Sequence, residues 1–411
     1  MPDITLSWRK VDSFPGNFSS PTTIQERPCP ICGSIRYRTF LRFDQFQFYS
    51  DSAGLPKRVD VRHVQCLECF TLYQNPSYSV YGFRTLFAEA GRSYGAAPSR
   101  VAEQVAWLSD KGLLERGISC LDAGCYEGTL LAAMPANVHR VGVDIDQPAI
   151  ERGQRSHGHH GIQFICGNFE SFHCNHRLDT ITMFHVLEHL PRPVEVLQNL
   201  RTMSHADTRL VVEVPLVENA VTNDLNGFFC SYHMTHFSRA SLESCLAWAG
   251  WKMCDSYQLG YNGFRVIALP AERGSKPQCD LKSRGVLADY FAHWFSSVKN
   301  VEARLSILDD AKRCFIWGGG AHTEFLYHLT SFFHAFPDRE YIIVDSDPMK
   351  QGTTWRGLCI DAPTVLSNHR WSDERVLVSS YGGQFGILQA AVDLGVPKEM
   401  MVSLYDSVQA Y

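Results

Sequence analysis

The stretch Leu121-Asp-Ala-Gly-Cys-Tyr-Glu-Gly128 decides the fold of the central part of this chain. It continues the short apolar segment 118–121, which is typical of a buried strand, and its glycines allow a sharp turn from strand to helix. In a doubly wound sheet, ligands bind beyond the carboxyl ends of the strands, where such glycines let the backbone approach them. We therefore expect a ligand site at this turn.

The segments after the turn alternate between strand and helix patterns. We expect strands at 141–143, 162–165, 180–184 and 210–214, with helical stretches between them such as 193–203. A helical pattern at 96–114 precedes the first strand. This alternation predicts an α/β fold with a parallel, doubly wound (Rossmann-like) sheet.

A carboxylate ends the second expected strand, in Val141-Gly-Val-Asp144. An acid at this place can accept hydrogen bonds from both ribose hydroxyls of an adenosine, although it can equally be a helix cap. A glycine turn alone is also weak evidence for a cofactor site. Together, Asp144 and the turn Asp122–Gly128 indicate a cofactor that contains adenosine.

These motifs, with Asp179-Thr-Ile-Thr-Met-Phe-His-Val-Leu-Glu-His-Leu190, resemble the class I methyltransferase family, which uses S-adenosyl-L-methionine (SAM). The resemblance covers about 150 residues. It implies that Gly124 and Cys125 line the methionine part of the cofactor, that Asp144 holds the ribose, and that Asn168 and Phe169 flank adenine. The whole set of cofactor residues that it implies is Asp122, Gly124, Cys125, Gly128, Asp144, Asn168 and Phe169.

Methyl transfer needs an aligned acceptor and often a base that removes its proton, a task that suits histidine. The catalytic candidates are His185, Glu188 and His189, which follow the expected strand 180–184, and His233. Leu-Glu-His-Leu recurs in the family with many acceptors, so Glu188 and His189 can equally maintain the fold. His233 is the better candidate for the base, with support of the acceptor pocket as its alternative role.

Two cysteine pairs, Cys29-Pro-Ile-Cys32 and Cys66-Leu-Glu-Cys69, stand near the beginning of the chain. Two such knuckles can complete a tetrahedral zinc site with no open position, which makes the expected site structural. The alternative is that they are ordinary buried or redox cysteines. His63 ranks below the four cysteines as a ligand.

A third region follows the polar stretch Pro270–Pro277. It begins with a helical pattern at 288–310 and continues with a strand at 314–317, Gly318–Gly320, and a strand at 341–344 that ends in Asp345. The glycines can cradle a phosphate or form only a tight turn. We expect three domains: a zinc-binding module at 1–85, a methyltransferase domain at 95–270, and a C-terminal Rossmann-like domain at 285–411.

This order of parts resembles the zinc-containing C-methyltransferases that act on nucleotide-linked keto-deoxysugars. In that family the C-terminal domain helps hold the nucleotide sugar, and a Tyr-His-Glu-His run supplies the base. Here the run is Cys230-Ser-Tyr-His233, which keeps the histidine and lacks the acid before it. The resemblance implies C-methylation of a nucleotide-linked sugar, which is the leading expectation. Because the acid is missing, O- or N-methylation of a sugar or related small polar acceptor is nearly level with it.

Composition narrows the partners. The 43 acidic residues against 38 Lys and Arg give no large basic surface, so we expect no nucleic-acid partner. The start, Met1–Lys10, lacks the apolar run of a signal peptide, and no stretch reaches the length of a membrane span, so we expect a cytoplasmic protein. The competing class is a catalytically silent cofactor-binding or scaffolding protein that keeps the fold. The sequence does not determine the oligomeric state.

Overall fold

The computed structural model describes ten ranges of the chain, namely 16–17, 21–48, 57–83, 98–174, 177–219, 222–230, 232–260, 262–277, 281–367 and 369–408. The expectation for Met1–Lys10 and the domain bounds 85 and 95 lie outside these residues. Three sheets of five, seven and six strands organise the described part, together with a two-stranded ribbon.

The N-terminal sheet is built on a long antiparallel hairpin. Its strands are β1 (Gly16–Asn17), β3 (Tyr37–Phe48), β4 (Lys57–Cys66), β5 (Leu72–Gln74) and β12 (Thr235–His236). β2 (Ile24–Gln25) and β6 (Ser77–Tyr78) pair separately. The short strand β12 comes from the middle of the chain and pairs with β5, so the sheet joins two regions that are far apart in sequence.

The central sheet has the order β13-β14-β11-β10-β7-β8-β9. Its strands are β7 (Ser119–Ala123), β8 (His139–Asp144), β9 (Gln163–Cys166), β10 (Leu178–Phe184), β11 (Ser204–Pro215), β13 (Trp251–Gln258) and β14 (Gly263–Pro270). The five strands from β7 to β11 are parallel, as their alternation with helices predicts. β7 is buried along its whole length, which explains its apolar sequence.

One edge of the central sheet departs from the expected parallel arrangement. β14 pairs antiparallel with both β11 and β13. The connection between β13 and β14 is only a short loop, and a short loop can join antiparallel neighbours but cannot make a parallel crossover. The sheet is therefore mixed, with a hairpin at its edge.

Helices cover the central sheet. They are α2 (Pro98–Asp110), α3 (Thr129–Ala133), α4 (Gln147–His157), α5 (Pro193–Thr202) and α6 (Arg239–Trp248), with the short turns η1 (Gly158–His160), η2 (Leu187–His189) and η3 (Val217–Asn219). Asp146 caps α4, because its side chain accepts a hydrogen bond from the backbone N–H of Ala149. This cap fixes the start of α4 at Gln147, three residues after Asp144.

The C-terminal sheet has the order β17-β18-β16-β15-β19-β20. Its strands are β15 (Arg313–Trp317), β16 (Glu340–Val344), β17 (Thr354–Trp355), β18 (Leu358–Asp361), β19 (Glu374–Val378) and β20 (Met401–Ser403). All neighbours are parallel except β17 and β18. The helices here are α8 (Ala321–Leu329), α9 (Phe332–Ala335) and α10 (Gln384–Asp393), with η4 (Ser306–Leu308), η5 (Pro363–Leu366) and η6 (Lys398–Met400). The region is a second Rossmann-like unit.

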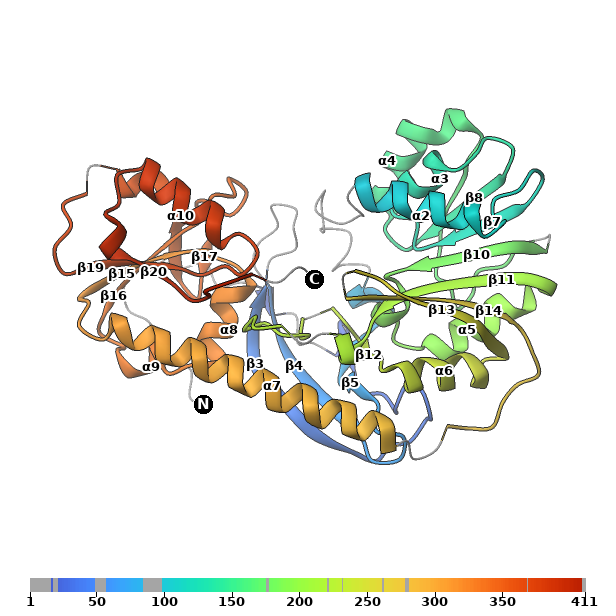
Figure 1. Cartoon of the computed structure of the whole chain (residues 1–411), viewed down its shortest axis with the longest axis horizontal. Helices are drawn as coiled ribbons and strands as arrows, with labels where there is room; N and C mark the ends of the chain where they lie inside the picture. The colour runs from blue at the N-terminus through green and yellow to red at the C-terminus, as the bar shows by residue number, and fades with distance from the viewer. Residues whose placement is uncertain are drawn as a thin grey trace.

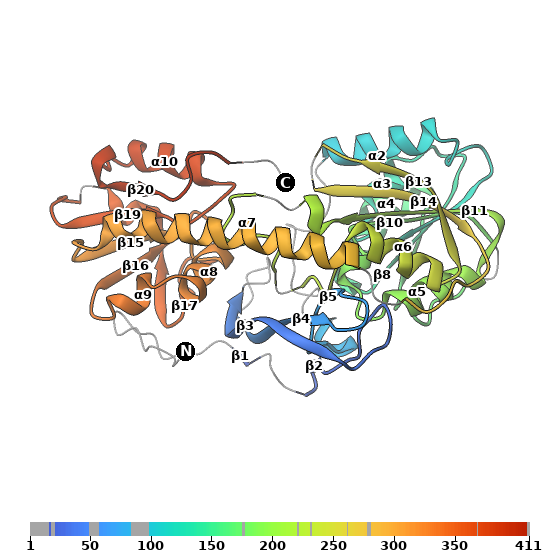
Figure 2. The same ribbon diagram turned by 60° about the horizontal axis from the view of Figure 1, so that its bottom comes forward.

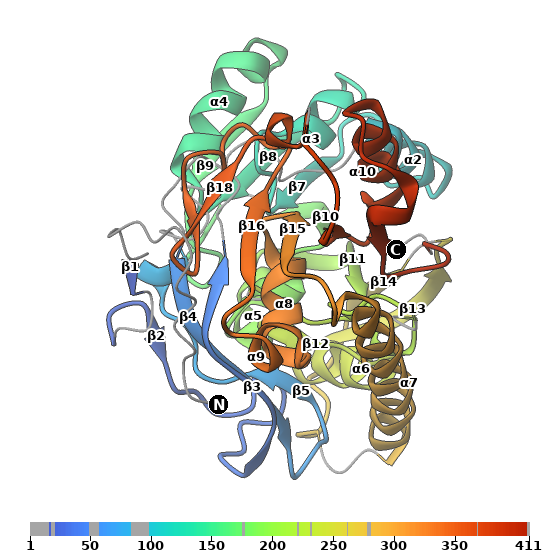
Figure 3. The same cartoon turned by 90° about the vertical axis from the view of Figure 1, so that its left-hand side faces the viewer.

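Helix α7 (Leu281–Leu305) connects the two large sheets. In Figures 1 and 2 it runs from the green central sheet to the orange and red C-terminal sheet, and the blue hairpin β3–β4 lies between them. Figure 3 shows the molecule from the C-terminal side, with β15 and β16 in front. The Trp294 side chain donates to the carbonyl oxygen of Leu225 at 3.0 Å, which ties α7 to the segment after β11.

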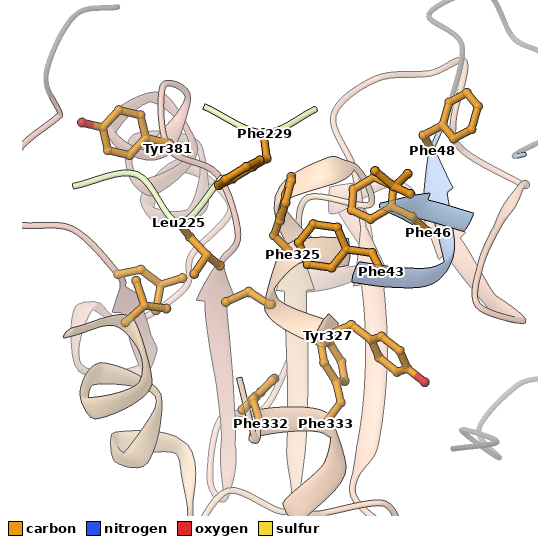
Figure 4. Close-up of a cluster of buried hydrophobic side chains, with 14 of the residues drawn as sticks. Phe43, Phe46, Phe48, Leu225, Phe229, Phe325, Tyr327, Phe332, Phe333 and Tyr381 are labelled. Atoms are coloured by element: carbon orange, nitrogen blue, oxygen red, sulfur yellow. The ribbon is translucent and has the colours of Figure 1, made fainter. Parts of the chain in front are cut away.

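A shared aromatic core joins the N-terminal hairpin to the C-terminal sheet. Figure 4 shows Phe43 and Phe46 of β3 beside Phe325 of α8. The ring centroid of Phe325 lies 5.4 Å from that of Phe43 and 5.1 Å from that of Phe46. All three rings are at most 2% exposed. Removing one such ring typically costs about 3–5 kcal/mol of stability, so the hairpin is firmly packed on the C-terminal unit.

Within the ranges that the structure describes, the helices are either too short or too polar to cross a lipid bilayer.

Candidate functional site

A cavity of about 260 Å³ lies at the carboxyl ends of β7, β8 and β10. Three parts of the chain that the sequence singles out line it: the glycine turn, the end of β8, and the start of the segment after β10. Parallel strands present their carboxyl ends at one edge of the sheet, which explains why these distant motifs meet. Its wall includes Asp122, Gly124, Cys125, Asp144, Phe169 and His185.

The glycine turn has the backbone that a closely approached ligand requires. Gly124 and Gly128 have φ values of +87° and +75°, which only glycine adopts readily. A Cβ on Gly124 would lie 2.4 Å from Val186 Cγ2, and one on Gly128 would lie 2.4 Å from Phe164 Cε1. These two positions therefore exclude a side chain, and at Gly124 the bare backbone faces the cavity.

Asp144 meets the turn at the end of β8. Its Oδ2 accepts a hydrogen bond from the backbone N–H of Tyr126 at 2.8 Å, and its Oδ1 accepts one from the N–H of Asp146 at 2.9 Å. Burial raises the pKa of Asp144 to about 6, although these bonds oppose the shift. Each carboxylate oxygen keeps a lone pair, so the side chain can accept two further hydrogen bonds, as a pair of ribose hydroxyls would supply.

Asp122 lies below the turn and is 4% exposed. Its Oδ1 accepts a hydrogen bond from the Thr182 hydroxyl at 2.7 Å, and burial raises its pKa to about 7. Cys125 follows in the same turn and is also buried against the cavity.

The two residues expected beside adenine differ in their placement. Phe169 is 6% exposed and lines the cavity, as does Ile145, which the sequence reading did not select. Asn168 is not part of the cavity wall. Its side-chain oxygen accepts a hydrogen bond from the N–H of Glu170 at 3.1 Å, in a local turn.

The segment after β10 brings three of the catalytic candidates together. His185, in the left-handed region with φ +55°, lies on the cavity wall, and its Nδ1 is 3.3 Å from Glu188 Oε1. His189 also lines the cavity, and its Nδ1 is 3.0 Å from the carbonyl oxygen of Tyr232. Glu188 is 1% exposed, and burial opposes its charge. The neighbouring histidines His189 and His185 outweigh that cost and lower its pKa.

His233 joins this group from the segment before β12. Its ring centroid lies 4.9 Å from that of His189, and Glu188, His189 and His233 each place a polar side-chain atom within 4.8 Å of the others. Burial lowers the pKa of His233 to about 3, so its ring is neutral. Its Nδ1 is buried and has no hydrogen-bond partner among the described residues.

The structure adds wall residues that the sequence reading missed. Arg100 and Gln104 reach the cavity from α2, and Phe83 reaches it from the segment after β6. None belongs to a motif, because their role depends on how α2 and the N-terminal part pack over the sheet. A helical pattern before the first strand was the only signal available.

The four cysteines of the knuckles meet in one buried cluster. Cys29 Sγ lies 3.6 Å from Cys69 Sγ, and Cys32 Sγ lies 3.5 Å from Cys66 Sγ. All four sulfur atoms lie within 4.8 Å of one another, and none forms a disulfide. Sulfurs around a tetrahedral zinc ion with bonds of about 2.3 Å stand about 3.8 Å apart, so the cluster fits zinc. His63 lies elsewhere, 3.0 Å from His236.

The C-terminal glycine turn has a different environment. The N–H of Gly319 donates to Asp345 Oδ2 at 2.8 Å, and Lys350 Nζ lies 3.2 Å from the same oxygen. A Cβ on Gly318 would lie 2.3 Å from the carbonyl oxygen of Ser379. Close packing against β19 and its following loop is thus sufficient to explain Gly318.

The comparisons with known proteins concern the central region. Residues 95–256, less than half of the chain, match the family model described as a methyltransferase domain. No curated protein matches the chain.

Solved structures similar to part of the chain include magnesium protoporphyrin IX methyltransferase from Synechocystis with bound SAH. It is 19% identical, covers 46% of this chain and 98% of its own, and has a TM-score of 0.37. The CcbJ methyltransferase from Streptomyces caelestis is 13% identical over 46% of this chain and 96% of its own, with a TM-score of 0.36. The N-methyltransferase NodS from Bradyrhizobium japonicum is 14% identical over 42% of this chain and 96% of its own, with a TM-score of 0.33.

The matched residues include the glycine turn, Asp144 and the segment from His185 to His189, the features that build the cavity. The predicted enzyme class is confirmed, whereas the narrower family of nucleotide-sugar enzymes stays a prediction. The chain therefore carries an S-adenosylmethionine-dependent methyltransferase domain.

Proposed function

We propose that this enzyme methylates a carbon of a nucleotide-linked sugar, next to a ketone, and that the cavity holds SAM. The observation that carries the proposal is one group of four side chains, His185, Glu188, His189 and His233, of which His185 and His189 line the cavity and the other two lie directly behind them. A methyl donor in the cavity would have a neutral base and a carboxylate beside its reactive end.

The proposed donor site uses the residues that the resemblance to class I methyltransferases implies. Asp144 would hold the ribose, and Gly124 and Cys125 would adjoin the methionine part, with Asp122 and Gly128 shaping the turn. Phe169 would flank adenine, whereas Asn168 lies outside the cavity wall and has no proposed contact with the donor. Bound SAM supplies an electrophilic methyl group on a sulfonium. Arg100 of the cavity wall is a candidate partner for the donor's carboxylate, because a guanidinium pairs well with a carboxylate.

His233 is the proposed base. A neutral ring with a buried, unpaired Nδ1 can take the proton from the carbon beside the ketone. The carbon then attacks the methyl group, a C–C bond forms, and the S–C bond breaks with its electron pair left on sulfur. Burial disfavours the charge on protonated His233, and the nearby Glu188 carboxylate offsets that cost.

Glu188 also bears on the choice of acceptor atom. The run Cys230-Ser-Tyr-His233 lacks the acid that precedes the base in the sugar C-methyltransferases. Glu188 brings a carboxylate close to His233 from η2. This favours transfer to carbon, and transfer to oxygen or nitrogen of a similar acceptor is the alternative.

The cysteine cluster is proposed to bind one zinc ion. The buried sulfurs and their spacing support it. A closed tetrahedral site would organise the N-terminal sheet and take no part in the transfer.

A cytoplasmic location is proposed as well. The described cysteines form no disulfide with one another, which supports a reducing compartment.

Calorimetry tests the donor site first. SAM should bind the purified protein, and Asp144→Ala should weaken binding by tenfold or more, since hydrogen bonds to a charged group are worth about 1.5–3 kcal/mol. Glu151→Gln, an exposed change on α4, is the matched control. Absence of SAM binding, or equal binding by Asp144→Ala, would refute the assignment of the donor site to Asp144. Absence of binding would in addition favour the alternative of a catalytically silent scaffolding protein.

The acceptor is tested with labelled SAM and a panel of nucleotide-linked keto-deoxysugars, with a metabolite extract in parallel. Mass spectrometry would find the methylated product, and NMR would locate the new methyl group. A label found only on products other than sugars would overturn the acceptor class. A methyl group on oxygen or nitrogen would overturn carbon transfer.

A further inference from the structure

A line of alternating charges crosses the central sheet behind the cavity. Arg265 Nη1 and Nη2 donate to Glu103 Oε1 and Oε2 at 3.0 and 2.8 Å, and Arg265 Nε donates to Glu213 Oε2 at 2.7 Å. Glu213 Oε1 lies 3.0 Å from His185 Nε2, and His185 Nδ1 lies 3.3 Å from Glu188 Oε1. We name these five residues the charge line. It runs from α2 through β14 and β11 to the cavity wall.

Strand register builds the charge line. Glu213 of β11 stands opposite Arg265 of β14 on one side and Phe184 of β10 on the other, immediately before His185. Arg265 and Glu213 are both fully buried. The Arg265 guanidinium also packs over the rings of Trp107 and Phe184, 4.6 and 5.2 Å from their centroids. Buried charges are tolerated only when paired, and Arg265 and Glu213 are each paired by hydrogen bonds. The contact from His185 to Glu188 is an ion pair at 3.3 Å.

The geometry fixes the protonation of His185. A neutral imidazole has one N–H and could donate to only one of the two carboxylates, whereas the cation has two. Both ring nitrogens face a carboxylate oxygen, so the arrangement suits the cation. Burial opposes that charge, but the hydrogen bonds and charges of Glu188 and Glu213 outweigh it and raise the pKa of His185 to about 9.

We propose that Glu213 and Arg265 are positioning residues for methyl transfer: they hold His185 as a cation whose second N–H fixes the Glu188 carboxylate beside His189 and His233. Arg265 holds Glu213 in place, and Glu213 orients His185. Glu188 then stays ionised within reach of His233. The positive charge that His233 gains when it takes a proton is balanced by Glu188.

The charged and titratable groups around His185 come from several elements. Glu213 comes from β11, with Arg265 of β14 behind it, and Glu188 and His189 come from η2. His233 faces Glu188 from the segment before β12. Across the cavity stand Arg100 of α2, Asp122 of β7 and Asp144 of β8. Of these, Glu188 and Glu213 touch the His185 ring, so removing either carboxylate should change its titration most.

The test follows the His185 ring by NMR during a pH titration of the full-length protein, with His185→Asn used to assign the signals. In Glu213→Gln the titration midpoint should fall by about 1–3 pH units, the usual effect of losing a close opposite charge. Asp179→Asn is the matched control, because Asp179 pairs with His205 on the same sheet at 2.9 Å, away from the cavity. It should leave the His185 midpoint unchanged.

Glu188→Gln provides the same titration test if Glu213→Gln does not fold, because it removes the carboxylate at the other ring nitrogen. An unchanged His185 midpoint in a folded variant would overturn the proposal. This result does not depend on catalysis, so it is separate from a failure of the proposed function.

The kinetic arm rests on the proposed function and uses an acceptor found by the labelled screen. The alkaline fall of kcat should move to lower pH in Glu213→Gln by the same amount as the His185 midpoint. The KM for SAM should stay within about twofold, because Glu213 does not line the cavity. A shifted midpoint with an unchanged kcat profile would show that the charge line only supports the fold, and would refute the positioning role.

Discussion

The carboxylate of Asp144 and the backbone N–H of Tyr126 are joined by a hydrogen bond of 2.8 Å. This bond ties the end of β8 to the middle of the glycine turn after β7. The two motifs that the sequence separates thus form one rigid wall of the cavity.

Gly124→Ala should reduce the affinity for SAM at least tenfold, because its Cβ would displace Val186 on the cavity wall. Gly117→Ala is the matched control. Gly117 has a similar φ of +83°, but nothing lies within 4 Å of the added Cβ. Its substitution should therefore cost only the backbone strain of the left-handed region, about 1–2 kcal/mol of stability, and should leave SAM affinity unchanged. Equal SAM affinity for the two variants in calorimetry would show that the close approach to Val186 is unimportant.

SAM binding should weaken in acid. The pKa of free Asp144 is about 6, and hydrogen bonds from ribose hydroxyls would favour the carboxylate and lower that pKa in the complex. Affinity should therefore be constant above about pH 7 and fall by up to tenfold for each unit below pH 6. Calorimetry between pH 5 and 8 checks this. Asp144→Asn should flatten the profile, and an acid fall that persists in that variant would assign it to another group.

Asp122→Asn should stabilise the protein without ligand at pH 8 but not at pH 4. The folded pKa of Asp122, about 7, is raised above the ordinary value of 3.8, so the folded state binds the proton more tightly than the unfolded state. The contribution of Asp122 to wild-type stability is then greatest at low pH and is lost as pH rises from 3.8 to 7. The expected gain in Tm at pH 8 is about 2 °C or more. A lower Tm for the variant at pH 8 would show that the Thr182 hydrogen bond needs the carboxylate.

Cys29→Ser should lose most of the bound zinc and should loosen the N-terminal sheet, because a structural site contributes its binding energy to folding. Metal analysis by mass spectrometry measures the stoichiometry. Cys254→Ser, at an exposed position on β13, should keep the wild-type zinc content. A zinc content in Cys29→Ser equal to that of the control would refute the paired-knuckle site.

His233→Ala should lower kcat by about 10²–10⁴-fold, the usual contribution of a general base, with SAM affinity unchanged. The measurement is turnover with labelled SAM on an acceptor from the screen. His173→Ala, an exposed change in the loop before β10, should retain wild-type turnover. Wild-type turnover in His233→Ala would mean that another group takes the proton.

Much of the central fold was predictable because its signals are local. The apolar run before the turn at Asp122 and the acid at Asp144 lie within one strand-helix-strand unit, and the strands 141–143 and 180–184 fall inside β8 and β10. The second Rossmann-like beginning near Gly318 was visible in the same way. Periodicity and turn residues are sufficient for such units.

Long-range pairing was not predictable from local patterns. Glu213 and Arg265 read as ordinary polar positions in two strands, and only the register of β11 and β14 buries them against each other. The antiparallel edge and the membership of Thr235–His236 in the N-terminal sheet depend likewise on tertiary contacts. The placement of Arg100 over the cavity depends on helix packing, for which the sequence offers no motif.

The pairing of β12 with β5 has a consequence for synthesis of the chain. β5 is translated long before β12, so its edge carries unpaired N–H and C=O groups while the ribosome makes the methyltransferase region. The N-terminal sheet matures only after that region has emerged, which delays and couples the folding of the two. Shortened chains that stop before Thr235 should keep this open edge and associate with one another.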